Sequence, residues 1–96
     1  MTTNPADQAR VHIWVTGRVQ GVGFRAFVQH YGTQLRLGGW VRNVGYDQVE
    51  SVAEGPRPVL ERFTDLLKEG PTGSHVEAAK IDWEIPTGTF TRFEVR

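Results

Sequence analysis

The spacing of apolar residues switches between two periods along this chain, and the order of the switches limits the folds open to it. Residues 10–15 (RVHIWV) alternate valine or isoleucine with other side chains, which predicts a half-buried β-strand. From Phe24 the apolar residues recur every three or four positions, which predicts an amphipathic helix that continues to Gly38 and Gly39. Five residues form its expected apolar face: Phe24, Phe27, Val28, Tyr31 and Leu35.

Two further strands and a second helix follow. Residues 39–44 (GWVRNV) and 48–54 (QVESVAE) read as strands, and the connection between them is short enough for an antiparallel hairpin. The turn lacks the Asn-Gly or Asp-Gly pair that would specify its type. Residues 55–71 then combine a proline near the start with apolar residues at helical spacing, and Gly70 and Pro71 end the predicted helix.

The last segments complete a recognisable order of elements. Residues 76–85 predict a strand, and residues 92–96 predict a short final strand that presents Phe93 and Val95. The order β-α-β-β-α-β with an extra C-terminal strand is typical of a ferredoxin-like α/β sandwich of the α+β class. Right-handed crossovers would place both helices on one face of a single antiparallel sheet. One face of the 76–85 strand is expected to carry Ala79, Ile81, Trp83 and Ile85.

Length and composition narrow the classes of function. With 96 residues, of which 39% are hydrophobic, the chain suits one domain, expected at residues 10–96 after a flexible tail at residues 1–9. Eleven basic residues balance eleven acidic ones, so the charge does not favour nucleic-acid binding. The absence of cysteine fits the cytoplasm, and no apolar run approaches the roughly 20 residues of a membrane span. We expect a cytoplasmic protein, without a membrane contact, that is a monomer.

The stretch GRVQGVGFRAF (residues 17–27) joins the first strand to the first helix. Its glycines allow backbone amides to approach a ligand, and the loop leads into a helix N-terminus, where anions bind favourably. Arg25 in the first helical turn opposes the helix dipole by about 0.3–1 kcal/mol. This placement predicts an anion between the arginine and the amides. The glycines could also serve only to make the turn.

Known phosphate and metal motifs do not fit this loop. A P-loop would need a glycine at Val22 followed by Lys and Ser or Thr, and the dinucleotide fingerprint would need a third glycine and a parallel sheet. A cysteine phosphatase is excluded because the chain has no cysteine. His12, His30 and His75 are scattered and form no metal-ligand motif. We therefore expect no metal site.

A phosphoryl substrate with a good leaving group could be attacked directly by water, and an acyl phosphate is such a substrate. Phosphoryl transfer requires mainly positioning and stabilisation of oxygen charge. Asn43 is the best candidate to orient the water, because its amide both donates and accepts hydrogen bonds. Asparagine is also unfavourable within a strand. Asn43 could alternatively be no more than the residue that starts the hairpin turn.

Two motifs, GRVQGVGFR and GWVRN about fifteen residues later, together with VAEG and a helix ending in GP, closely resemble the acylphosphatase family from about Val11 to Val95. The resemblance implies a ferredoxin-like sandwich that hydrolyses acyl phosphates to a carboxylate and inorganic phosphate without metal or cofactor. It implies that Arg25 binds the phosphate and that Asn43 orients the water. Inorganic phosphate or sulfate would then compete with the substrate. The phosphate cradle maps onto the backbone amides of Arg18, Val19, Gln20, Gly21, Val22 and Gly23.

The chain departs from the family pattern at two places. The turn after Asn43 is Gly-Tyr-Asp-Gln instead of one with Asp-Gly, and Arg36 stands where a glycine commonly ends the first helix. Both departures concern local geometry and not the expected chemistry.

Two rival functions use the same fold. One is a nucleic-acid-binding module, which GFRAFV superficially resembles, although its aromatics fall at helical spacing. The other is a catalytically idle domain of the kind found within larger carbamoyl-transferring maturation proteins. Two further groups are interpreted as structural or solvated surface: the tryptophans Trp14, Trp40 and Trp83, and the arginines Arg18, Arg36, Arg42 and Arg57.

Overall fold

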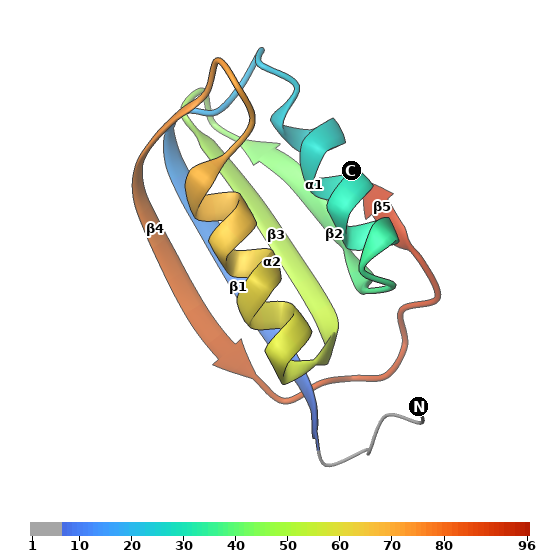
Figure 1. Cartoon of the computed structure of the whole chain (residues 1–96). Coiled ribbons are helices and arrows are strands. Elements are labelled where there is room, and N and C mark those ends of the chain that lie inside the picture. Colours follow the sequence, from blue (N-terminus) through green and yellow to red (C-terminus); the bar gives the residue numbers. More distant parts are fainter. Residues whose placement is uncertain (1–6) are drawn as a thin grey trace.

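The structure, a computed structural model, describes residues 7–96, so most of the tail predicted at residues 1–9 lies outside the described residues (Figure 1). The order of the predicted elements is confirmed. The elements are β1 (Gln8–Arg18), α1 (Phe24–Gln34), β2 (Gly38–Val44), β3 (Gln48–Pro56), α2 (Arg57–Glu69), β4 (His75–Glu84) and β5 (Phe93–Val95).

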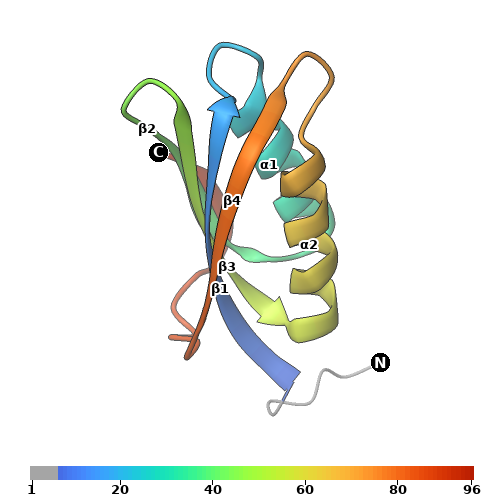
Figure 2. The same ribbon diagram turned by 90° about the vertical axis from the view of Figure 1, so that its left-hand side faces the viewer.

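The five strands form one sheet in the order β4-β1-β3-β2-β5, and both helices cover the same face of it, as predicted (Figure 2). The prediction of a wholly antiparallel sheet is wrong for β5, which runs parallel to β2. The path of the chain explains this direction. Because β4 is antiparallel to β1, it ends where β1 begins, and the chain then crosses below the sheet to enter beside β2 in the direction of β2 (Figure 1).

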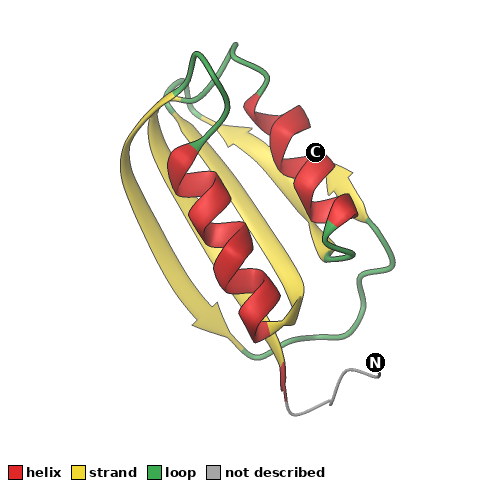
Figure 3. Cartoon of the chain, viewed as in Figure 1, coloured by secondary structure: helices red, strands yellow, loops and turns green. Residues whose placement is uncertain are grey.

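The core lies between the sheet and the two helices that cover it (Figure 3). The alternation predicted for β1 is confirmed, since Val11, Ile13 and Val15 are at most 1% exposed. They meet side chains of both helices, and Phe63 of α2 also contacts the ring of Phe93 in β5 at 5.7 Å between ring centroids. The helix face predicted for α1 is partly right: Phe24 and Val28 are buried, while Phe27 and Tyr31 are half-buried. This layer fixes the positions of both helix N-termini relative to the strand ends.

Helix α1 ends at Gln34, four residues before the predicted stop at Gly38. The cause is Arg36, whose φ of 59° lies in the left-handed region, so that the Leu37 N–H donates to the Gly32 carbonyl at 2.8 Å. The arginine therefore adopts the backbone conformation that glycine adopts most easily. Arg36 thus replaces the glycine of the family pattern, and the C-terminal cap of the helix is still formed.

The face predicted for β4 is confirmed for Ala79, Ile81 and Trp83, which pair with the buried Val15, Ile13 and Val11 of β1, but this face is only partly covered. Ile85 is 88% exposed and lies beyond the strand, and Ala79 is exposed, while Ile81 packs against the core. The reason is that β4 is an edge strand that only α2 partly covers. Trp83 lies under the guanidinium of Arg57, which is 3.9 Å from the ring centroid.

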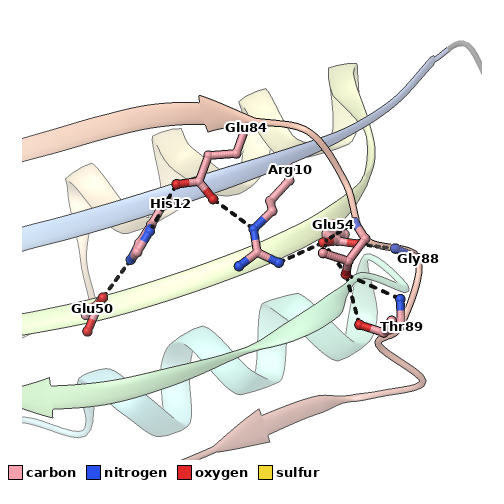
Figure 4. A network of polar contacts seen from close by, with 8 residues as sticks. Arg10, His12, Glu50, Glu54, Glu84, Gly88 and Thr89 are labelled. Carbon is pink, nitrogen blue, oxygen red and sulfur yellow. Dashed lines mark hydrogen bonds and ion pairs between the residues drawn. The ribbon is translucent and has the colours of Figure 1, made fainter.

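The helix-free face of the sheet carries an extended polar network (Figure 4). His12 lies between Glu50 and Glu84, with its Nε2 2.6 Å from a Glu50 oxygen, and Arg10 lies between Glu84 and Glu54. Both Glu50 and Glu54 are buried although no helix covers them. The interpretation of Trp14 and Trp40 as sheet-surface packing is confirmed, because both aromatic rings lie against other residues of this face.

Candidate active site

The last residues of β1 are shaped to deliver the chain to the loop before α1. The pairing of β1 with β4 shifts register between Thr16 and Gly17, which is a local bulge. Gly17 has a φ of 137°, and a Cβ there would overlap the carbonyl oxygen of His75, so glycine is required by close backbone approach. The Gly17 N–H donates to the carbonyl of Asp47 at 2.9 Å. The strand end is thus bonded to the turn between β2 and β3.

Residues 19–23, called the glycine loop below, connect β1 to α1. Val19 is fully buried and anchors the start of the loop in the core. Gly21 and Gly23 are exposed, with φ values of 73° and 76°, and no heavy atom lies within 4 Å of a Cβ built on either. Glycine is therefore needed at these two positions for the left-handed backbone and not for space. The surroundings of the loop are open to a ligand.

The N-terminus of α1 lacks the usual satisfying groups. Gly23 is the N-cap, no side chain caps the first amides, and the first turn contains no acidic residue. Arg25 is exposed, and no carboxylate within residues 7–96 forms an ion pair with it. The uncapped amides and this cation together form a local positive site that would attract an anion.

Asn43 lies near the end of β2, where it pairs with Val49 of β3. It lies two residues after the buried Val41, so its side chain is on the helix-covered face of the sheet. It is half-buried, and its amide forms no hydrogen bond with the part of the chain that the structure describes. Figures 1 and 2 show the β2–β3 turn and the glycine loop at the same end of the molecule. The fold brings together the two elements that carry Arg25 and Asn43.

The remaining candidate positions follow the loop. Arg18 is the exposed last residue of β1, and Val22 is half-buried and packs against the core. The sequence interpretation assigned only the backbone amide of Gln20, but its side chain donates to carbonyls of the β2–β3 turn. Its place between Val19 and Gly21 gives no periodic signal for such a contact. Only the folded arrangement of two distant segments reveals it.

The acidic residues of the helix-free face do not belong to this site. Burial would raise the pKa of Glu50, but hydrogen bonds from His12 and Arg42 outweigh it and lower that pKa. Burial opposes the charge of Glu54 in the same way, and bonds from Thr87, Arg10 and Gly88 lower its pKa. Both carboxylates and their ion-pair partners lie on the helix-free face of the sheet.

Two further properties concern the described residues. Within residues 7–96, no group of three or more His, Cys, Asp or Glu side chains is placed to hold a metal ion. None of the helices in that range is long and apolar enough to cross a membrane. Of the four arginines interpreted as structural or solvated surface, Arg42 and Arg57 are paired with Glu50 and Glu61.

The fold and the glycine loop define a class: a small ferredoxin-like α/β sandwich with a glycine-containing loop before its first helix. The sequence model of the acylphosphatase family matches residues 11–95. An acylphosphatase of Syntrophotalea carbinolica is 52% identical over 87 residues, covering 91% of this chain and 95% of the relative. The chain belongs to the acylphosphatase family and is a hydrolase that acts on acyl phosphates.

Solved structures agree with this assignment. An acylphosphatase from Coxiella burnetii is 34% identical, with a TM-score of 0.91, and the match covers 100% of both chains. The structure of full-length HypF in its phosphate- and nucleotide-bound form is 26% identical, with a TM-score of 0.81. That match covers 93% of this chain and only 12% of HypF. The resemblance to the acylphosphatase family and the ferredoxin-like fold expected from the sequence are confirmed.

Proposed function

We propose that the chain hydrolyses acyl phosphates by direct attack of a water molecule that Asn43 orients. In this proposal the guanidinium of Arg25 and the backbone amides of residues 18–23 hold the phosphoryl group. The planar guanidinium can donate two parallel hydrogen bonds to phosphate oxygens. The backbone amides are neutral and supply further hydrogen-bond donors. Both act where negative oxygen charge must be stabilised.

The reaction needs one displacement at phosphorus. The water oxygen attacks phosphorus while the bond from phosphorus to the acyl oxygen breaks, and the bonding electron pair leaves with the carboxylate. The protons of the water end on inorganic phosphate or in solvent. Asn43 can accept a hydrogen bond from the water and hold its lone pair toward phosphorus. Arg25 and the amides hold the equatorial oxygens during the transfer.

The observation that carries this proposal is the position of Arg25. A cation in the first turn of α1 lies beside uncapped amides, and no carboxylate in the described chain is paired with it. Both features are unfavourable in isolation and favourable when an anion lies between them. The Asn43 amide, which makes no hydrogen bond within the described residues, is similarly suited to a ligand.

The test is release of phosphate from a small aryl acyl phosphate such as benzoyl phosphate. We expect turnover that EDTA leaves unchanged and that inorganic phosphate and sulfate inhibit competitively. Loss of turnover on chelation, restored by a divalent ion, would contradict the proposed metal-free reaction. Absence of hydrolysis by the purified folded protein would favour the catalytically idle domain.

The other expectations also await tests. We infer a cytoplasmic monomer without nucleic-acid or membrane partners, because the charge is balanced and cysteine is absent. Binding of generic RNA in a filter assay, at physiological salt, would favour the rival nucleic-acid module. Sedimentation of the purified chain would test whether it is a monomer.

A further inference from the structure

The side chain of Gln20 joins the two segments that carry the proposed site. Its Nε2 lies 3.3 Å from the Val44 carbonyl oxygen, 3.1 Å from that of Gly45 and 3.0 Å from that of Gln48. An amide nitrogen has two hydrogens, so three acceptors must share them in bifurcated bonds. One side chain of the glycine loop thereby holds the turn that immediately follows Asn43.

Both segments that the Gln20 side chain joins are also held in place by other contacts. On the loop side, Val19 is fully buried, so the backbone just before Gln20 is anchored in the core. On the turn side, the Asp47 carbonyl accepts a hydrogen bond from the Gly17 N–H at 2.9 Å. The Gln20 amide adds a link from the loop itself to the turn. No other side chain of the glycine loop bonds to the turn, in the range of residues that the structure covers.

We propose that Gln20 is a positioning residue, which sets the placement of Asn43 relative to a phosphoryl group held in the glycine loop. The inference rests on the proposed function, because it assumes the roles given there to Asn43 and to the loop. Each bond of Gln20 reaches a backbone oxygen of residues 44–48, the stretch that directly follows Asn43. The donor acts on geometry and touches neither substrate nor water.

A purely structural role makes a different prediction. If Gln20 only satisfied the carbonyls of the turn, its loss would lower the melting temperature and leave the folded enzyme equally active. A positioning role predicts a lower kcat with phosphate affinity retained, because the loop and Arg25 still bind the anion. Misplacement of a reacting group by about 1 Å can reduce a rate by about 10²-fold.

The experiment compares Gln20→Met, which keeps a similar length without a donor, with the matched control Gln29→Met. Gln29 also donates from its side chain to a backbone carbonyl, that of Phe93 at 3.3 Å, but from the exposed part of α1. We expect kcat for benzoyl phosphate to fall about 10-fold or more in Gln20→Met. The inhibition constant of phosphate should stay within about 3-fold of the parent value. Gln29→Met should keep both constants.

A double-mutant cycle with Asn43→Ala makes the test specific. Once the Asn43 amide is gone, its placement no longer matters, so Gln20→Met should lower kcat little further. If the two fold-changes instead multiply, or if Gln20→Met loses only melting temperature, the positioning role is wrong. Should Gln20→Met fail to fold, Gln20→Asn serves instead, because it keeps the donor on a shorter side chain.

The same measurements separate the two proposals. If Asn43→Ala keeps the parent kcat, the role proposed for Asn43 is wrong, and the positioning role of Gln20 is wrong with it. If Asn43→Ala is impaired while Gln20→Met keeps the parent kcat, the proposed function survives and only the role of Gln20 is overturned.

Discussion

Two regions of this molecule treat arginine in opposite ways. On the helix-free face, Arg10 donates to Glu84 and Glu54, each at 2.8 Å, and its side chain is 19% exposed. At the loop end, Arg25 is exposed, and no carboxylate of residues 7–96 is paired with it. The first arrangement satisfies its charges within the fold. The second leaves a cation beside uncapped amides that are open to solvent, an arrangement that favours an anion.

This contrast shows how polar side chains that stabilise the fold can be told apart from polar side chains that serve a function. A polar group whose partners are all protein atoms stabilises the folded state. Removing one of those partners destabilises the protein. A polar group with no protein partner, held next to donors of the same kind, contributes to binding. The glutamates and Arg10 of the sheet are the first kind. We propose that Arg25 and Asn43 are the second.

The largest expected effect is that of Arg25→Ala on turnover. Removing an arginine that stabilises phosphoryl oxygens lowers kcat by about 10³-fold or more at other phosphoryl-transfer sites. Arg25→Lys keeps the charge without the two-pronged donor, so it should recover part of the phosphate binding and little of the turnover. Initial rates of benzoyl phosphate hydrolysis check both variants. Turnover near the parent value in Arg25→Ala would place this arginine with the solvated surface residues.

Asn43→Ala should have the next largest effect. We expect kcat to fall by about 10²-fold, as when one preorganised polar group is removed from a transition-state site. Inhibition by phosphate should survive, because the anion site does not include this side chain. Steady-state kinetics with phosphate as a competing ligand separate the two constants. A normal kcat would return Asn43 to the simpler role of a turn residue.

Glu54→Gln tests the other region, where stability and not turnover should change. Glu54 accepts hydrogen bonds from Arg10, from the Thr87 N–H and hydroxyl, and from the Gly88 N–H. Loss of the charge should lower the free energy of unfolding by about 1–3 kcal/mol. Urea unfolding measures this value, and kcat at low temperature should stay at the parent level. If Glu54→Gln kept the parent stability and lost turnover, Glu54 would belong to the functional region and not to the stabilising one.

The same carboxylate predicts a direction of pH dependence. Because the pKa of Glu54 is below its ordinary 4.5 in the folded protein, the unfolded chain takes up the proton first as the pH falls. Stability from this group is therefore complete above about pH 4.5 and is lost as the pH falls through the folded-state pKa. Glu50 and Glu84 have lowered pKa values and add to the same slope. Glu54→Gln should show a shallower loss below pH 4.5 than the parent.

The smallest expected effect concerns a residue outside both regions. Arg36 has a left-handed backbone at the end of α1, so Arg36→Gly should raise the free energy of unfolding by about 0.5–1 kcal/mol. Arg36→Ala keeps the strain and should bring no such gain. Thermal unfolding of the two variants distinguishes backbone strain from loss of the arginine side chain, since the latter would affect both equally.

The sequence predicted the element order, the common face of the helices and the core of β1, because these follow from local periodicity. It could not predict the direction of β5, which depends on where β4 ends. Nor could it predict that Glu50 and Glu54 are buried, because glutamates on a strand resemble a solvated face until neighbouring strands supply their partners. Arg25 and Asn43 could be predicted as site candidates because each is locally unfavourable where it stands. The Gln20 side chain gave no such signal.

The central claim is that Arg25 serves to bind an anion and not to stabilise the fold. Thermal unfolding across a phosphate titration tests this claim most directly. Phosphate at about 100 times its dissociation constant should stabilise the parent by about 2.7 kcal/mol, which is several degrees of melting temperature. Arg25→Ala should melt close to the parent without phosphate and gain almost nothing from it. Arg10→Ala should melt well below the parent and gain the full increment. The account is contradicted if Arg25→Ala melts far below the parent without phosphate yet gains the parent's full increment.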